Sequence, residues 1–308
     1  MELSYFIYKY INSTRIWSTS FLISGSLISL SFFIKNEVNL GNGFNIFRFC
    51  LSFLVLYFLN NISNLVNTYY DFINGLDKKE TSADRTLFQN SIKITLNDIE
   101  FFIKITYLGV LISLITLLVN CNLQFNETIY HVLPITITIS FISHFYTAPP
   151  ISFKYRALGE ISASFNLFSI VPFPIYFQNI QLFKDYFNEI FNYSMILTIS
   201  CCTIIFSNNI RDLKNDKISN IITIPIIIGE NLSYSIYFSI YFLIYFYLFI
   251  LSIIYNNIYL NLPTIITITS LYNIFKDTKN GNYKHWDLKT AKLSFILCVS
   301  LSIGIFCK

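Results

Sequence analysis

The chain has 308 residues, of which 54% are hydrophobic and only 12% are charged, and its mean hydropathy is +0.55. So few charged side chains cannot cover the surface of a soluble protein. The 32 Phe and 22 Tyr exclude a disordered chain, because disordered segments contain few aromatic residues. Composition therefore predicts a protein embedded in a lipid bilayer, and the net charge of +4 has meaning only through where the charges lie.

We count nine apolar stretches long enough to span a bilayer, and because several are near the short limit, the expected number of transmembrane helices is eight or nine. They are rich in Ile, Phe and Tyr, which favour strands in soluble proteins, but backbone polar groups in lipid must be hydrogen-bonded within their own segment, which predicts helices. We expect an all-α, polytopic membrane protein that forms one domain over 1–308 and begins with a short cytoplasmic tail at 1–16. The predicted transmembrane segments are 17–34, 45–66, 101–120, 131–149, 159–178, 194–210, 232–255, 257–275 and 291–307.

Lys and Arg are concentrated in the N-terminal tail and in every second connection between these segments. The charge-rich connections include 71–100, 211–230 and 276–292. Because Lys and Arg are enriched in the cytoplasmic connections of membrane proteins, this asymmetry predicts that these connections are cytoplasmic and that the two termini lie on opposite sides. The basic residues lie between membrane segments, so no nucleic-acid partner is expected.

A first acidic cluster ends the second predicted helix. Asn67 and Asp71 are four residues apart, so their side chains share one face of the helix end. Gly75 is predicted to end that helix, which lets Asp77 return toward the same face.

A second acidic cluster ends the sixth predicted helix, where Asp212 and Asp216 are again four residues apart. Carboxylate and amide oxygens without His or Cys suit a hard cation, and Mg²⁺ typically binds through one or two carboxylates plus substrate phosphates. The two clusters therefore predict a Mg²⁺-dependent site for a diphosphate with a lipophilic tail. The basic residues that would balance the charge of the diphosphate are Lys78, Arg85, Lys154 and Arg211.

Two other interpretations of the acidic clusters stay open at this point. Acidic residues at helix ends are often solvated surface groups with no ligand. A transporter could also use such oxygens as a cation site, although transporters tend to hold their ions near the bilayer midplane, on helices interrupted by Gly or Pro.

Several motifs resemble those of the UbiA superfamily of intramembrane prenyltransferases, and they are most similar to its menaquinone-forming branches. The resemblance covers most of the chain from residue 60 onward. Thr68 stands where most bacterial members have Asp, and Lys217 begins a segment that departs from the usual Arg-x-Ala-Gly. The matching segments are Asn64–Phe72, Gly75–Asp77, Asp84–Leu87, Tyr146–Pro150, Phe153–Tyr155, Leu158–Glu160, Asn208–Asp212 with Asp216, and Thr290–Leu293.

The resemblance implies about nine transmembrane helices around a central cavity, with the acidic motifs on cytoplasmic connections. It implies Mg²⁺ as the cofactor and a set of metal ligands: Asn67, Asp71, Asp77, Asp212 and Asp216. The residues implied to bind the diphosphate are Asn64, Lys78, Arg85, Lys154, Asn209 and Arg211. Those implied to take part in catalysis are Asp71, Tyr146, Asp212 and Asp216, with Tyr146 near the allylic cation that forms when the carbon–oxygen bond breaks.

The reaction implied by the resemblance is transfer of a prenyl group, geranylgeranyl or longer, from a polyprenyl diphosphate to a naphthoquinol-type acceptor in menaquinone (vitamin K2) biosynthesis. The acceptor could instead be 1,4-dihydroxy-2-naphthoate, with decarboxylation. A non-catalytic membrane protein that senses prenyl lipids is the alternative from another class. The endoplasmic reticulum or Golgi is the implied membrane, with a mitochondrial membrane as the second option.

Overall fold

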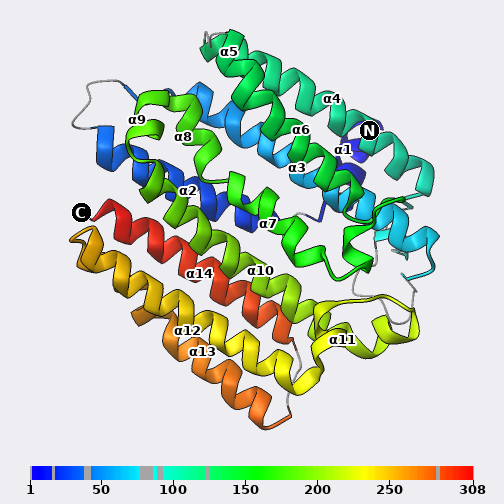
Figure 1. The fold of residues 1–308 in the computed structure, drawn as a ribbon. Coiled ribbons are helices and arrows are strands. Elements are labelled where there is room, and N and C mark those ends of the chain that lie inside the picture. Colours follow the sequence, from blue (N-terminus) through cyan, green and yellow to red (C-terminus); the bar gives the residue numbers. More distant parts are fainter. Residues whose placement is uncertain are drawn as a thin grey trace. The chain divides into compact units, whose positions relative to one another are not determined.

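The computed structural model describes residues 2–15, 18–37, 43–76, 86–88, 93–121, 125–281 and 285–307. Among these residues every regular element is a helix, and one isolated backbone bridge joins Arg156 to Ile222 (Figure 1). The all-α prediction is therefore confirmed.

The main helices are α1 (Glu2–Ser13), α2 (Thr19–Glu37), α3 (Ile46–Ile73), α4 (Leu96–Cys121), α6 (Leu133–Phe145), α7 (Gly159–Ser169), α8 (Pro172–Gln178), α10 (Phe187–Ile218), α12 (Glu230–Ile254), α13 (Leu262–Lys279) and α14 (Trp286–Phe306). The short ones are η2 (Thr86–Phe88), α5 (Phe125–Glu127), η3 (Thr128–Val132), η4 (Phe153–Tyr155), α9 (Ile180–Asp185), α11 (Ile224–Ile228) and η5 (Ile258–Asn261).

Each predicted apolar segment is found in one or two helices. The segment predicted at 159–178 is broken into α7 and α8, because Pro172 stands in the first turn of α8 and has no N–H for a continuous helix. In the described part of the chain, six helices are long and apolar enough to cross a membrane, so the count of nine stays a prediction. These six are Ile46–Ile73, Leu96–Cys121, Phe187–Ile218, Glu230–Ile254, Ile258–Lys279 and Trp286–Phe306.

The chain divides into two compact units. Unit 1 contains residues 1–20 and 47–155, and unit 2 contains residues 21–46 and 156–308. The first acidic motif belongs to unit 1 and the second to unit 2. The single domain stays a prediction, and so does the cytoplasmic place of the N-terminal tail, whose residues form helix α1.

Unit 1 is built on the contact of α1 and α3 with α4. Leu65 of α3 and Phe102 of α4 belong to one buried cluster, and the rings of Phe6 and Tyr10 from α1 each lie 5.4 Å from the ring of Phe102. Gly109 lets α4 approach α3 closely, since a Cβ there would lie 2.9 Å from the Phe58 ring. The end of α3 is thereby held in a fixed place within this unit.

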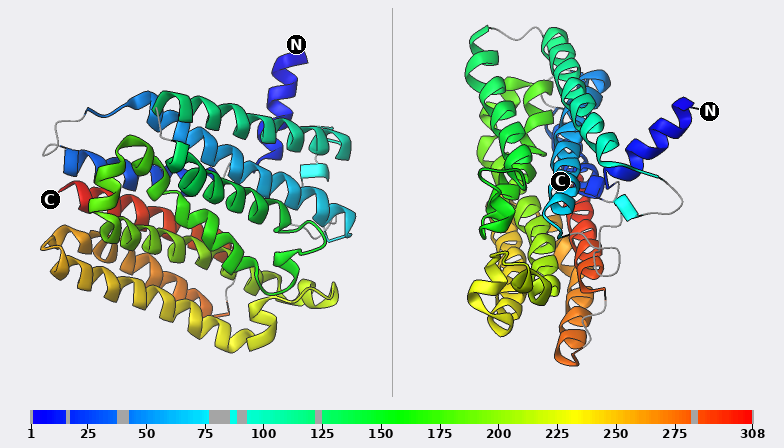
Figure 2. Two further views of the ribbon diagram at one scale, coloured as in Figure 1. Left: turned by 45° about the horizontal axis from the view of Figure 1, so that its top comes forward. Right: turned by 90° about the vertical axis from the view of Figure 1, so that its right-hand side faces the viewer.

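Unit 2 is built around α10, which packs against α7, α12 and α14. Helices α12, α13 and α14 lie side by side and run antiparallel in sequence order (Figures 1 and 2). Buried tyrosine hydroxyls on α12 set the register, because each makes a 2.8 Å hydrogen bond to a neighbouring helix: Tyr237 with Thr290, Tyr241 with Ser294 and Tyr245 with Thr267. Buried polar groups that are fully paired in this way specify one packing arrangement.

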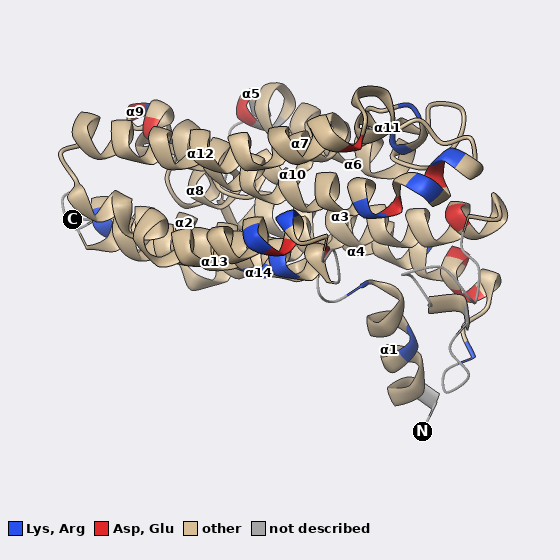
Figure 3. Cartoon of the chain, turned by 90° about the horizontal axis from the view of Figure 1, so that it is seen from below, with Lys and Arg blue, Asp and Glu red and all other residues tan. Residues whose placement is uncertain are grey.

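Charged residues of the long helices lie near the helix ends. Figure 3 shows the middle of α10, α12, α13 and α14 almost without Lys, Arg, Asp or Glu. Charged side chains are costly inside a bilayer, so this distribution suits helices that span one. Both acidic motifs follow the same rule, since each stands in the last turns of its helix.

Candidate active site

The first acidic motif lies on the last turns of α3, as predicted. Asn67 is 6% exposed and Asp71 is 4% exposed, on the same face of the helix. Gly75 ends the helix: its φ is +68°, and the next residue, Leu76, donates its N–H to the carbonyl of Asp71 at 2.9 Å. A left-handed glycine of this kind is a common helix stop. The predicted residues Asp77, Lys78 and Arg85 lie outside the described residues.

A lysine from the mid-chain loop bridges this motif. The Lys154 ammonium donates to the Asn67 Oδ1 atom at 3.1 Å and to the Asp71 Oδ2 atom at 2.6 Å. The Tyr155 hydroxyl donates to the other carboxylate oxygen, Asp71 Oδ1, at 2.6 Å. Both oxygens of a nearly fully buried carboxylate are therefore bound, one of them by a positive charge.

The mid-chain loop is folded so that these two side chains reach α3. The N–H of Lys154 donates to the carbonyl of Tyr146 at 2.8 Å, which closes the loop and brings its end back beside its start. The Tyr146 side chain is half-buried, and its proposed contact with the reacting centre stays a prediction. Asn64 is engaged within unit 1: its amide donates to the Thr14 carbonyl at 3.0 Å and to the Ser18 hydroxyl at 2.7 Å. Its role in diphosphate binding also stays a prediction.

The second acidic motif lies on the last turns of α10. The Arg211 guanidinium binds the neighbouring Asp212 through two bonds, Nε to Oδ1 at 2.8 Å and Nη2 to Oδ2 at 2.6 Å. Arg211 also pairs with Asp287 in the first turn of α14. Asp216 follows one turn after Asp212 and is half-buried. Asn209, which lies three residues before Asp212 on α10, donates a hydrogen bond from its side-chain amide to the Glu160 Oε1 atom at 2.7 Å.

Tyr155, Glu160 and Asp287 contact predicted site residues, and sequence reasoning assigned them no role. Tyr155 and Glu160 belong to segments that match the family motifs, so their positions next to Lys154 and Gly159 could have indicated that they lie at the site. Asp287 carried a weaker signal, an acidic residue at the start of the last helix.

The residues of the first motif fit a hard cation. Oxygens of Asn67 and Asp71 converge on one positively charged atom, the Lys154 ammonium nitrogen, so a cation at that point is favoured by two oxygen ligands. Among the described residues no group of three or more His, Cys, Asp and Glu side chains is close enough to hold a metal without a substrate. Mg²⁺ commonly completes its shell with water and substrate phosphate, so a small set of protein oxygens is sufficient.

Comparison with known proteins identifies the family. Residues 38–296 match the model of the UbiA prenyltransferase family. UbiA prenyltransferase domain-containing protein 1 of Dictyostelium discoideum is 29% identical, over 80% of this chain and 73% of its own. The Xenopus tropicalis protein of the same name is 27% identical, over 96% of this chain and 81% of its own.

Solved structures support the same fold. A UbiA homologue from Aeropyrum pernix has a TM-score of 0.67 at 12% identity and covers 92% of this chain and 97% of its own. A UbiA homologue from Archaeoglobus fulgidus bound to GPP and Mg²⁺ has a TM-score of 0.61 at 12% identity and covers 97% of this chain and 100% of its own. With its apolar helices, this chain is a multi-pass membrane protein. The family match spans most of its length, so the chain belongs to the UbiA prenyltransferase family and is a prenyltransferase.

Proposed function

We propose that this protein transfers a prenyl group, geranylgeranyl or longer, from a polyprenyl diphosphate to a naphthoquinol-type acceptor, with Mg²⁺ as cofactor, in menaquinone biosynthesis. The motifs that resemble the menaquinone-forming branches support the choice of acceptor. Two structures of the Archaeoglobus fulgidus homologue, bound to GPP or DMAPP together with Mg²⁺, support the diphosphate and the metal.

The observation that carries this proposal is the bridge from Lys154 to Asn67 and Asp71. A buried carboxylate and an amide oxygen that both point at one cation would supply two oxygen ligands to Mg²⁺, and the lysine beside them is a suitable partner for phosphate oxygens. We expect Lys154 to leave Asp71 and bind the diphosphate when the substrate and metal arrive. The ligands on the first motif would be Asn67, Asp71 and Asp77, and those on the second Asp212 and Asp216.

Bound Mg²⁺ would stabilise the negative charge that grows on the leaving diphosphate. The positive charges of Lys154 and Arg211 add to that stabilisation. Tyr155 holds the Asp71 carboxylate in one orientation through its 2.6 Å bond. Tyr146, by the resemblance, would face the allylic carbon with its aromatic ring. The bilayer around the helices would keep water away from the reacting carbon.

The test is a turnover assay with the purified full-length protein in detergent. Labelled geranylgeranyl diphosphate and Mg²⁺ are added with either menadiol or 1,4-dihydroxy-2-naphthoate, and products are identified by mass spectrometry. A prenylated product from menadiol supports the proposal. If product forms only with 1,4-dihydroxy-2-naphthoate, that compound and not menadiol is the acceptor. Substrate binding without any product would contradict the enzymatic function.

We further propose the endoplasmic reticulum or Golgi as the membrane of residence, following the animal branch that the motifs resemble. Imaging of a tagged protein against organelle markers tests this. A purely mitochondrial signal would contradict it.

A further inference from the structure

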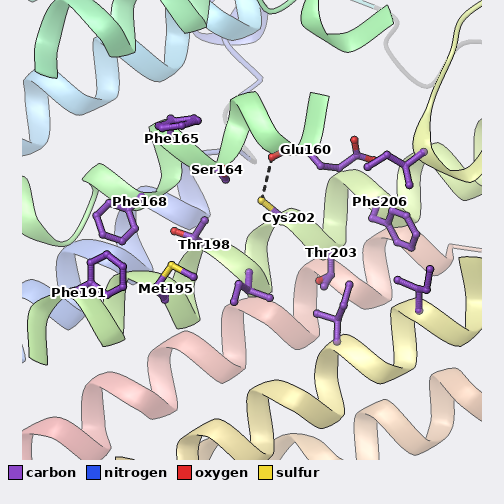
Figure 4. A pocket seen from close by; sticks show the side chains of 14 residues that line it. Glu160, Ser164, Phe165, Phe168, Phe191, Met195, Thr198, Cys202, Thr203 and Phe206 are labelled. Atoms are coloured by element: carbon purple, nitrogen blue, oxygen red, sulfur yellow. Dashed lines mark hydrogen bonds between the residues drawn. The ribbon is translucent and has the colours of Figure 1, made fainter. Parts of the chain in front are cut away.

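Unit 2 contains a pocket of about 630 Å³ between α7, α10, α11 and α12. Small-molecule sites typically have volumes of about 300 to 1,000 Å³ and apolar walls with a few polar groups, and this pocket has both properties. Figure 4 shows Phe168, Phe191 and Met195 at one end and Phe206 with Glu160 at the other.

Glu160 is the acidic residue of this pocket, and it lacks a partner for one oxygen. It is 8% exposed. Its Oε1 atom accepts the 2.7 Å bond from Asn209, whereas its Oε2 atom is buried and has no hydrogen-bond partner within the described part of the chain. Leaving a buried polar atom unpaired is costly, and more so for a charged group. A hydrogen-bond donor that reached this oxygen from the pocket would remove that cost.

The chemistry of the carboxylate selects among the molecules that an apolar pocket could hold. An isoprenoid chain has no hydrogen-bond donor and would leave Glu160 unpaired. A diphosphate or a quinone offers acceptors, which a carboxylate repels. An aromatic hydroxyl donates, and its ring packs favourably on the Phe side chains of the walls. The pocket is best matched by an aromatic ring that carries a hydroxyl group.

The position of Glu160 relative to the second acidic motif strengthens this assignment. Its partner Asn209 precedes Asp212 on α10 by three residues, which corresponds to an axial rise of about 4.5 Å. The hydroxyl end of a ligand bound at Glu160 would thus lie near the level of the acidic motif. The backbone carbonyl of Glu160 also accepts a hydrogen bond from the thiol of Cys202 on α10 at 3.6 Å. This contact holds the start of α7 against α10 (Figure 4).

We propose that this pocket binds the reduced, hydroxyl-bearing aromatic acceptor, and that Glu160 accepts a hydrogen bond from its hydroxyl and thereby selects the hydroquinone over the quinone. This rests on the proposed function for the identity of the acceptor. Glu160 is a substrate-binding residue in this arrangement, and Asn209 positions it.

The test measures binding of menadiol, kept reduced with dithionite, and of menadione to the full-length protein in detergent by microscale thermophoresis. The wild type is expected to bind menadiol about tenfold or more tightly than menadione. In Glu160→Gln the amide can donate to a quinone carbonyl, so this preference is expected to be lost or reversed. Ser164→Ala, a change on the same pocket wall, is the matched control and should alter neither affinity by more than about twofold.

Phe168→Trp provides a second variant that leaves Glu160 intact. Filling the far end of the pocket should weaken menadiol binding by about tenfold. Stabilisation by geranylgeranyl diphosphate with Mg²⁺ confirms that each variant is folded. An unchanged preference for menadiol over menadione in Glu160→Gln, or an unchanged menadiol affinity in Phe168→Trp, overturns the proposal, even if the wild type forms prenylated product. Conversely, loss of that preference in Glu160→Gln together with weaker menadiol binding in Phe168→Trp supports the pocket even if the wild type forms no product, and only the proposed reaction is then contradicted.

Discussion

The two acidic motifs differ in how their carboxylates are neutralised. The side chain of Asp71 is 6% exposed, and its partners Lys154 and Tyr155 come from a loop 83 and 84 residues further along the chain. The side chain of Asp212 is 39% exposed, and its partner Arg211 is the preceding residue of the same helix. Asp71 therefore depends on the folding of a distant loop, whereas Asp212 is paired by its neighbour in the same helix, an arginine that also contacts Asp287 of α14.

This difference indicates different roles for the two basic residues. A buried carboxylate without a partner is strongly unfavourable, so we expect Lys154 to contribute to the stability of unit 1 in addition to its proposed role in substrate binding. A carboxylate near water loses little when its partner is removed. Arg211 is therefore expected to matter for activity far more than for stability.

Removal of Mg²⁺ should have the largest effect, because it affects both motifs at once. With EDTA in excess, prenyl transfer is expected to fall by about a thousandfold or more, since the proposed Mg²⁺ would neutralise the charge of the leaving diphosphate. Product formation is followed by chromatography, and addition of Mg²⁺ beyond the EDTA should restore it. Full turnover in EDTA would show that neither motif acts through a metal.

Substitution of one carboxylate in each motif should come next. Asp71→Asn and Asp212→Asn are each expected to lower kcat/KM by about a hundredfold or more, because transition-state charge is no longer balanced. The control is Asp185→Asn, which neutralises an exposed carboxylate on α9 and should change kcat/KM by less than about twofold. A normal rate in either motif variant would remove that motif from the site.

Removal of the basic partner should lower the free energy of unfolding more at the first motif than at the second. Lys154→Met is expected to lower the free energy of unfolding by about 2 to 3 kcal/mol, because it leaves the buried Asp71 carboxylate without its counter-charge. Arg211→Met should cost about 1 kcal/mol, since its partners Asp212 and Asp287 keep 39% and 19% of their side-chain surface exposed. Denaturant unfolding in mild detergent measures both. Equal losses of unfolding free energy in the two variants would mean that the burial of the carboxylate does not determine how much its basic partner stabilises the protein.

Loss of a single hydroxyl should give the smallest effect. Tyr155→Phe removes the 2.6 Å bond to Asp71 and is expected to cost about 1 to 2 kcal/mol. Tyr234→Phe removes a similar bond of 2.8 Å, to Glu230 on the exposed surface of α12, and should cost about 0.5 kcal/mol or less. Denaturant unfolding measures both variants. A larger loss of unfolding free energy in Tyr234→Phe than in Tyr155→Phe would contradict the expectation that the buried bond contributes more.

The helical segments were predictable, while some of their boundaries were not. Helix α10 runs from Phe187 to Ile218, well beyond the apolar stretch predicted at 194–210, because a helix continues into water with charged residues in its last turns. Helix α1 was expected as a tail, since its apolar residues are interspersed with polar ones and its packing on α4 supplies most of its stability. The break between α7 and α8 was marked in the sequence by Pro172 and Pro174.

What the sequence alone determined is the class of protein and the spacing of its acidic motifs. Long apolar stretches require helices in lipid, and the spacing of four residues places Asn67 with Asp71, and Asp212 with Asp216, on common helix faces. These are local properties of the chain. The tertiary structure decided which partners the acidic groups have, because Lys154 and Tyr155 reach Asp71, and Asn209 reaches Glu160, only when segments distant in sequence pack together. Such contacts depend on the folding of loops and on burial, which local spacing does not encode.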